Sequence, residues 1–407
     1  AYCNTISSII DVSAERHHRY EPAYDNAMSR LFVLLIALLG SATLRAAPPF
    51  KGIPDPPTLP VRSYLLMDHA SGQVLAESHA DVRVEPASLT KIMTVYAVAD
   101  ALKKGLVRLD DRPVISEYAW KQEGSRMFIE VNKQVSVDEL LHGDIIQSGN
   151  DASVALAEHV SGSEEVFATV MNGHAKRLGM KSSSFANSTG LPDPATFTTA
   201  RDMATLGRAL IGDFPEIYAM FKEPEYTFNG ITQRNRNGLL GRDPSVDGIK
   251  TGHTEAAGYC LVASAMRDGM RLISVVMGAE SDGARTQASQ ALLNYGFRFF
   301  ENRQLYAQGA TVTTGRVWQG AAQQVDVGMR RDLAVIVPRG AQGDRVTASA
   351  ELQKPLVAPL EKGQVVGTLV VKHEAQELAR EPLVALNAVA SGSWFRQAID
   401  AARLLFE

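Results

Sequence analysis

Two side chains three positions apart, Ser88 and Lys91, have the types and spacing of an activated nucleophile. On a helix, positions i and i+3 project from one face, so the hydroxyl and the amine can hydrogen-bond. Serine is a poor nucleophile until a nearby base takes its proton. Lysine can be that base only when it is neutral, which requires burial or a neighbouring cation. Lys250, the first residue of a Lys-Thr-Gly triplet, is a candidate for that cation.

Two further motifs could handle the substrate. Ser148-Gly149-Asn150 is predicted to lie on a loop just before a helix, where a hydroxyl can pass a proton to a leaving amine and an amide can hold both the substrate backbone and Lys91. The segment Lys250–His253 follows Val246–Ile249 on a predicted edge strand. Such a strand can pair with an extended peptide, and a glycine at position 252 would let a ligand approach the backbone closely.

Each motif alone is weak evidence, but their joint occurrence in this order is specific. Together they resemble the active-site residues of penicillin-binding proteins and class A β-lactamases, with Ser148-Gly149-Asn150 in the place of Ser-Asp-Asn. From about Pro60 to the C-terminus the chain resembles the low-molecular-mass D-alanyl-D-alanine carboxypeptidases. The segments that carry this resemblance are Ile145–Ala152, Thr199–Ala204, Arg236–Leu240, Val246–Gly258 and Leu272–Gly278.

The resemblance implies an exported serine peptidase that removes the terminal D-alanine from peptidoglycan stem peptides, without a cofactor, and that β-lactams inhibit covalently. In that family's scheme Ser88 would be the acylated nucleophile, Lys91 its general base and Ser148 the proton relay. The residues implied to bind the substrate are Asn150, Lys250, Thr251, Gly252, His253 and Arg201.

Three of these roles need a closer definition. Lys250 and Thr251 would engage the terminal carboxylate with Arg201 nearby, although a structural salt bridge explains Arg201 equally well. His253 would offer its backbone N–H, with that of Ser88, to an oxyanion. Thr189 stands where some relatives carry a histidine, and a threonine cannot act as a base, so a role of this position in deacylation stays open.

Three alternative functions are compatible with parts of the pattern. A β-lactamase of this type needs a glutamate within Glu-x-x-Leu-Asn, and the nearest similar segment, Gln290–Asn294, begins with glutamine. A peptidoglycan endopeptidase would use the same acyl-enzyme, so the motifs do not separate it from a carboxypeptidase. A non-catalytic wall-binding protein is opposed by the complete set of motif residues.

The elements that must position these residues indicate an α+β fold. Tyr64–Met67 and Val74–Ala76 are predicted to form a hairpin, and Tyr259–Ala263 and Leu272–Val276 to form antiparallel strands. Because strands at both ends enclose a helical block, the N- and C-terminal pieces should close one sheet. We expect a penicillin-binding-protein/β-lactamase-like catalytic domain over residues 57–301 and a small β-rich domain over residues 302–388.

The two ends of the chain suggest export and membrane attachment. Residues 28–46 have the basic start, short apolar core and small residues of a signal peptide, so we expect Met28 to be the true start and residues 1–27 to be a doubtful extension. Residues 393–407 are predicted to form an amphipathic helix that either lies in a membrane interface or docks on the chain's own core. The expected location is the periplasmic face of the inner membrane.

Charge and cysteine content exclude other partners. The formal net charge of −4 comes without a basic patch, so no nucleic-acid partner is expected. Cys3 lies in the doubtful extension, which leaves Cys260 without an internal disulfide partner. We find no metal-ligand spacing, and expect no metal.

Overall fold

A computed structural model describes residue 50, residues 52–340 and residues 346–404. The predicted extension, the signal peptide and the start at Met28 lie outside the described residues, as do the last three residues of the predicted C-terminal helix.

The first part of the chain is built on a five-stranded antiparallel sheet. Its spatial order is β2-β1-β7-β6-β5, so the N-terminal hairpin pairs with strands from late in the sequence. The predicted closure of the sheet by both ends is therefore confirmed. The bounds are β1 Ser63–Asp68, β2 Val74–Ser78, β5 Val246–Thr254, β6 Gly258–Arg267 and β7 Met270–Ala279.

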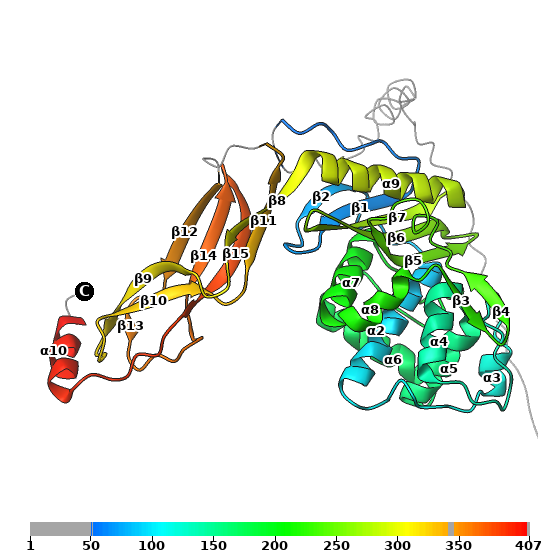
Figure 1. Cartoon of the computed structure of the whole chain (residues 1–407), viewed down its shortest axis with the longest axis horizontal. Helices are drawn as coiled ribbons and strands as arrows, with labels where there is room; N and C mark the ends of the chain where they lie inside the picture. Colours follow the sequence, from blue (N-terminus) through cyan, green and yellow to red (C-terminus); the bar gives the residue numbers. More distant parts are fainter. Residues whose placement is uncertain (1–49, 51, 341–345, 405–407) are drawn as a thin grey trace, which may run out of the picture. The chain divides into compact units, whose positions relative to one another are not determined.

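Helices cover both faces of this sheet, which explains why β6 and β7 are almost continuous apolar runs. Helix α9 (Asp282–Phe299) lies on one face, and α2 (Thr90–Lys103) and α7 (Ala200–Asp213) lie in the helical layer on the other (Figure 1). The remaining elements of this part are η1 Ala87–Leu89, α3 Glu117–Trp120, α4 Val137–His142, η2 Gly143–Gln147, α5 Asn150–Ser161, α6 Glu164–Leu178, α8 Pro215–Tyr218, η3 Ala219–Lys222, β3 Glu225–Phe228 and β4 Ile231–Arg234.

Helix α2 is the central helix of that layer. Eleven of its fourteen residues are buried, including Lys91 in its first turn. A helix that is buried nearly all round shows little amphipathic pattern, which is why the apolar residues of α2 are not confined to one face. The serine motif is therefore attached to the most enclosed helix of the domain.

The second part is β-rich, as expected for this fold class. A six-stranded sheet has the order β12-β14-β15-β10-β9-β13, and β8 pairs with β11. Strand β8 begins at Phe300, directly after α9 ends at Phe299. The bounds are β8 Phe300–Tyr306, β9 Thr311–Trp318, β10 Gln324–Met329, β11 Leu333–Pro338, β12 Val346–Leu352, β13 Leu356–Val357, β14 Val365–His373 and β15 Gln376–Ala385.

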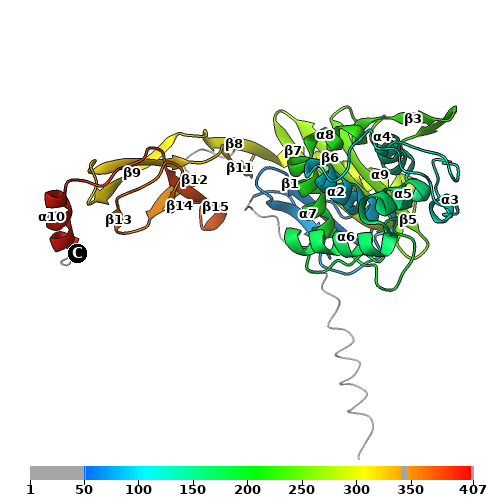
Figure 2. The ribbon, with the colours of Figure 1, turned by 90° about the horizontal axis from the view of Figure 1, so that it is seen from below.

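A terminal helix, α10 (Trp394–Leu404), lies at the β9 and β13 end of this β-rich part (Figure 2). It docks through a polar residue, because the buried Asp400 accepts a hydrogen bond of 2.9 Å from the backbone N–H of Gln319. Its apolar residues Trp394, Phe395 and Ile399 are exposed by 79%, 61% and 41%. Within the described residues, no helix has the length and apolar character to cross a membrane.

Candidate active site

The serine of the first motif sits at the junction between η1 and α2. Ser88 lies in η1, and Lys91 follows in the first turn of α2, so that Nζ of Lys91 is 3.5 Å from Oγ of Ser88. Ala87 adopts a positive φ of 47°, which turns the chain into the helix. The predicted i and i+3 pairing of hydroxyl and amine is present.

Lys91 is fully buried, and its amine is held by two oxygens from distant parts of the chain. Nζ donates to Oδ1 of Asn150 at 2.7 Å and to the carbonyl of Thr189 at 2.6 Å. Burial lowers the pKa of Lys91 to about 8. Roughly one amine in ten would then be neutral at pH 7, against fewer than about one in a thousand for an ordinary lysine. The structure therefore gives Lys91 the character of a usable base.

Ser148, which follows η2, and Asn150, the first residue of α5, belong to the same short connection. Ser148 adopts a left-handed conformation with φ 67°, and its buried hydroxyl has no hydrogen-bond partner among the described residues. A non-glycine residue in this conformation is uncommon and often marks a functional site. Asn150 starts α5, and its Nδ2 donates to the carbonyl of Glu123 at 2.6 Å, so its Oδ1 is oriented toward Lys91.

The loop in front of α5 is fixed by the residue that follows Asn150. Asp151 accepts hydrogen bonds from the backbone N–H groups of Met127, Phe128 and Ile129. The backbone N–H of Asn150 in turn donates to the carbonyl of Ser125 at 2.7 Å. Asp151 therefore holds the wall of the site in place.

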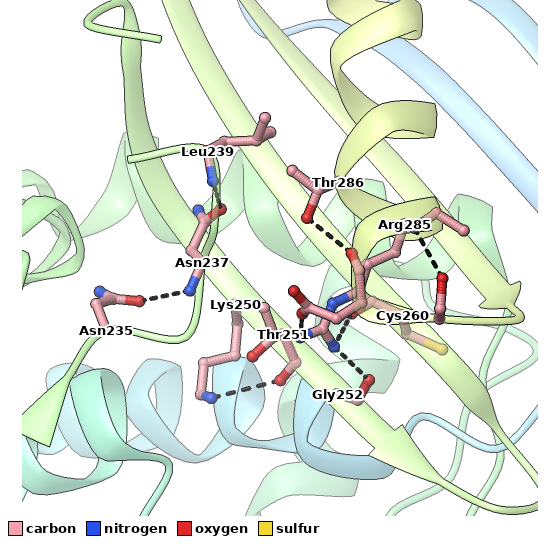
Figure 3. Close-up of polar contacts among 12 residues, drawn as sticks. Asn235, Asn237, Leu239, Lys250, Thr251, Gly252, Cys260, Arg285 and Thr286 are labelled. Carbon is pink, nitrogen blue, oxygen red and sulfur yellow. Dashed lines mark hydrogen bonds and ion pairs between the residues drawn. The ribbon is translucent and has the colours of Figure 1, made fainter. Parts of the chain in front are cut away.

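The third motif lies on the edge strand β5, as predicted. The side chains of Lys250 and Thr251 are buried, and Nζ of Lys250 lies 3.4 Å from the carbonyl of Thr251 (Figure 3). Burial lowers the pKa of Lys250 well below its ordinary value, and the nearby Lys91 lowers it further. Two buried amines thus lie close enough for the charge of Lys91 to influence Lys250.

Gly252 is needed for packing. A Cβ atom at this position would lie 2.9 Å from the carbonyl oxygen of Pro86 and 3.1 Å from the backbone nitrogen of Leu89. The absence of a side chain therefore lets β5 lie directly against η1. These contacts give Gly252 a packing role, and its expected role in the approach of a ligand stays a prediction.

Two supports behind β5 were missed from the sequence. The buried Arg285 of α9 donates to the carbonyls of Gly252 at 3.0 Å and Cys260 at 3.2 Å (Figure 3). On the opposite side, Nδ2 of Asn237 donates to the carbonyl of Gly248 at 2.9 Å. Both residues bond backbone atoms of the strand, a role that no sequence motif reveals.

His253 and Thr189 contribute in different ways. The His253 ring is exposed and stacks on Tyr259 with ring centroids 3.9 Å apart, which agrees with a secondary role for that side chain. Thr189 contacts Lys91 through its carbonyl, while its hydroxyl donates to Oδ1 of Asn187. The neighbouring Gly190 fits so closely that a Cβ atom would lie 1.9 Å from the carbonyl oxygen of Ala87.

The prediction that Arg201 lies near the substrate carboxylate is wrong. Its guanidinium pairs with Glu77 at the end of β2 and with Asp81, and its backbone N–H bonds the carbonyl of Ala80. Strand β2 is at one edge of the sheet, and β5, which carries Lys250, is at the other. The structural salt bridge, the other explanation of Arg201, is the one the structure supports.

Arg236 is a guanidinium near the two lysines, and no sequence motif assigned it a role. Its positive charge lowers the pKa of both Lys91 and Lys250, and burial lowers its own pKa. Within the part of the chain that the structure describes, it forms no ion pair with a carboxylate. The only sequence signal was its place at the start of Arg236–Leu240, one of the segments that carry the family resemblance.

Comparison with known proteins connects this geometry to a family. Residues 51–281 match the family described as D-alanyl-D-alanine carboxypeptidase, and residues 300–391 match the C-terminal domain of penicillin-binding protein 5. The D-alanyl-D-alanine carboxypeptidase DacC of Escherichia coli (strain K12) is 47% identical over 360 residues, covering 86% of this chain and 90% of the relative.

Solved structures agree over both parts of the chain. Penicillin binding protein 5 from Haemophilus influenzae is 43% identical with a TM-score of 0.78, covering 83% of this chain and 100% of its own. The cefotaxime-bound form of penicillin-binding protein D2 from Listeria monocytogenes is 29% identical with a TM-score of 0.53, covering 60% of this chain and 100% of its own.

These matches favour a carboxypeptidase over a β-lactamase, an endopeptidase or a non-catalytic wall-binding protein. The predicted fold class and family are both confirmed. The chain therefore belongs to the D-alanyl-D-alanine carboxypeptidase family of penicillin-binding proteins and is a serine-type peptidase of that family.

Proposed function

We propose that this chain removes the terminal D-alanine of peptidoglycan stem peptides through an acyl-enzyme on Ser88. The observation that carries the proposal is the environment of Lys91. Its amine is fully buried, reaches the hydroxyl of Ser88, and is oriented by two oxygens from elsewhere in the chain. A buried lysine of lowered pKa beside a serine can act as the adjacent base that activates the hydroxyl for nucleophilic attack.

In the first half of the reaction, Oγ of Ser88 attacks the carbonyl carbon of the penultimate D-alanine while Lys91 takes the hydroxyl proton. The backbone N–H groups of Ser88 and His253 are proposed to bind the oxyanion that forms. When this tetrahedral intermediate collapses, the C–N bond breaks and the amine of the terminal D-alanine leaves. Ser148, whose hydroxyl has no partner among the described residues, passes it a proton and takes in exchange the proton that Lys91 accepted, so that both groups return to their starting state.

Substrate binding would use the remaining groups of the cluster. Lys250, Thr251 and Arg236 provide positive charge and a hydroxyl for the terminal carboxylate, while Asn150 orients the peptide backbone. Strand β5 is the edge of its sheet, so it can pair with an extended peptide. Water then attacks the ester of Ser88 and releases the shortened peptide.

The test is D-alanine release from a pentapeptide ending in D-Ala-D-Ala, using the chain from about residue 47 onward. The unsubstituted protein should release D-alanine, and Ser88→Ala should not. The same pair of proteins is treated with a fluorescent penicillin, which should label only the protein with Ser88. Release or labelling that persists in Ser88→Ala would reject the assigned nucleophile.

β-Lactam antibiotics are proposed as covalent inhibitors at the same serine. The match to penicillin-binding proteins and the likeness to a cefotaxime-bound relative support this. Attack by Ser88 would open the lactam ring and leave an ester on Ser88, of the same kind as the acyl-enzyme that the peptide substrate forms. Penicillin added before the pentapeptide should therefore abolish D-alanine release in proportion to the labelled fraction.

Membrane attachment through α10 is also proposed. The support is that the helix docks by Asp400, which leaves Trp394, Phe395 and Ile399 exposed. Aromatic residues on one face of a helix suit the boundary between lipid and water. Charges along the helix nearly balance, so apolar burial would supply most of the affinity.

Sedimentation with liposomes tests this attachment. The full chain should pellet, a chain ending at Ser391 should not, and Trp394→Ser with Phe395→Ser should behave as the truncated chain does. Arg316→Ser, outside α10, serves as the control and should still pellet. Equal pelleting of the full and truncated chains would refute the anchor.

Export to the periplasm is proposed from residues 28–46. Support comes from the sequence pattern and from relatives named D-alanyl-D-alanine carboxypeptidases, whose substrate type belongs to the cell wall. N-terminal sequencing of the secreted protein should find a start close to Ala47. A mature N-terminus upstream of Met28 would contradict both the signal peptide and the start at Met28.

A further inference from the structure

One buried carboxyl group below the cluster has no role in the steps above. Asp144 lies in η2 and is fully buried. Its Oδ1 accepts a hydrogen bond from the hydroxyl of Ser153, and its Oδ2 has no hydrogen-bond partner among the described residues. An unsatisfied buried carboxylate costs free energy. The neighbours Ile145 and Ile146 are apolar, and an apolar residue at position 144 would avoid that cost.

The position of Asp144 connects it to the catalytic amine. Asn150, which accepts from Lys91, and Ser153, which donates to Asp144, are three residues apart on α5 and share one face of that helix. Segment η2 packs against α2, the helix of Lys91, as well as against α5. The carboxyl group of Asp144 therefore lies under the pair of buried lysines.

The other carboxyl groups close to the lysines are already used. Asp151 accepts from the backbone of the 127–129 loop. Glu164 accepts from the backbone N–H and hydroxyl of Ser188. Among the three carboxylates that raise the pKa of Lys91, only Asp144 has an oxygen without a hydrogen bond.

Charged groups on α4, one of the elements packed against η2, have partners of their own. On α4, His142 contacts Asp138 and also Glu223, which follows η3, and it stacks on Tyr226 of β3. On the same helix, Glu139 completes a capping box with Ser136. From α2 and β5, the groups that face Asp144 are Lys91 and Lys250, and from α5 it is Asp151.

We propose that Asp144 is a positioning residue whose buried negative charge keeps one proton on the Lys91–Lys250 pair. With that proton on Lys250, a cation remains for the substrate carboxylate while Lys91 is free to act as the base. Without the negative charge of Asp144, the two buried amines would both tend to lose their protons. This inference rests on the roles proposed above for the two lysines.

Electrostatics supports the geometry. Burial raises the pKa of Asp144 to about 6, while Lys91 and Lys250 both act to lower it. Conversely, Asp144 acts to raise the pKa of each lysine against the effect of burial. Above about pH 6 the carboxylate is thus negative, and the lysine pair holds protons more tightly than it would alone.

The test is the pH dependence of peptide hydrolysis in Asp144→Asn. The amide keeps the shape and can still accept from Ser153, but it removes the charge. Both lysines then bind protons less tightly, so both limbs of the kcat/KM profile should move to lower pH by about one unit, a tenfold change in proton affinity. At pH 8 we expect KM to rise about tenfold, with kcat changed less than threefold.

Ser153→Ala is the matched second variant. It keeps the carboxyl group but removes its hydrogen-bond donor, which raises the pKa of Asp144 further. KM should therefore rise at pH 6 and be unchanged at pH 8.5, where Asp144 is still negative. This variant keeps the inference testable if Asp144→Asn does not fold.

Penicillin labelling and thermal melting are measured on both variants to separate folding from function. A labelled, folded Asp144→Asn protein whose pH profile is unshifted would overturn the inference, as would a Ser153→Ala protein with equal KM changes at pH 6 and 8.5. Failure of the lysine roles themselves would appear separately, as peptide turnover in Lys91→Arg.

Discussion

The two edges of the five-stranded sheet use their cationic side chains in opposite ways. Beside β2, Arg201 is held by two carboxylates, Glu77 and Asp81, at the surface. On β5, Lys250 is buried and forms no ion pair within the described residues. A cation that is paired with carboxylates of its own chain, as Arg201 is, contributes to the stability of the fold. A cation kept buried at a cost and left unpaired is available to an external carboxylate.

The largest effect that tests this comparison is expected from Lys91→Arg. Arginine keeps the positive charge but cannot give up its proton, so the base is lost. Loss of a general base typically costs about 10²–10⁴-fold in rate, and we expect D-alanine release to fall by that range. Turnover within tenfold of the unsubstituted protein would mean that the base lies elsewhere.

The pH dependence of penicillin labelling gives the next effect. Because the pKa of Lys91 is about 8 and its neutral form is the reactive one, the labelling rate should rise as pH increases. We expect about a tenfold increase per pH unit between pH 5 and 7, since the neutral fraction changes by that factor below the pKa. Stopped-flow or gel-based labelling measures the rate, and a flat profile would contradict the prediction.

Arg236→Ala tests whether the guanidinium near Lys250 binds substrate, in contrast to the paired Arg201 beside β2. Removing this unpaired guanidinium takes positive charge away from the site of the two lysines, and we expect KM for the pentapeptide to rise about tenfold to a hundredfold, the range for a charge-assisted hydrogen bond. The free energy of unfolding should change little. If KM is unchanged, the carboxylate is bound without Arg236.

Gly252→Ala tests how closely β5 lies against η1. The added Cβ atom would meet the backbone of Pro86 and Leu89, so we expect a loss of about 1–3 kcal/mol in the free energy of unfolding and weaker penicillin labelling. Gly173→Ala is the control, because a Cβ atom there meets nothing within 4 Å and the position is in the middle of α6. Equal melting curves for the two variants would refute the packing argument.

The smallest effect is expected from Arg201→Ala. Ion pairs at the surface contribute about 0–1 kcal/mol, so the free energy of unfolding should fall by no more than that. D-alanine release should stay within about twofold of the unsubstituted protein. A large rise in KM would restore the substrate-binding role that the sequence suggested.

Local patterns explain why much of this architecture could be predicted. Local sequence patterns predict that Ser88 and Lys91 share one helix face and that Lys250 lies on an edge strand, because both features depend on periodicity and neighbouring residues. The β-rich second part could also be expected, because short apolar runs alternate there with glycine and proline. The resemblance to a family then supplied the way in which the pieces assemble.

Other features depend on contacts that no local pattern encodes. The hydrogen bond from Lys91 to Thr189 ends on a backbone carbonyl, which any residue type would provide. Arg201 and Arg236 look alike in the sequence. The sheet order separates Arg201, beside β2, from β5, while the charge of Arg236 acts on Lys91 and Lys250. Asp144 follows an ordinary helical segment, so its burial beneath two lysines appears only when three elements are packed together.

The contacts around Lys91 come from distant parts of the chain, so Ser88 and Lys91 become reactive only when these parts have come together. The oxygens that hold its amine come from two distant segments, those of Asn150 and Thr189, and its burial requires the finished helical layer. In an unfolded chain this lysine would have its ordinary pKa near 10.4 and Ser88 would have no base. The peptidase is therefore chemically silent while the chain is being synthesised, and it becomes reactive only on completion of folding.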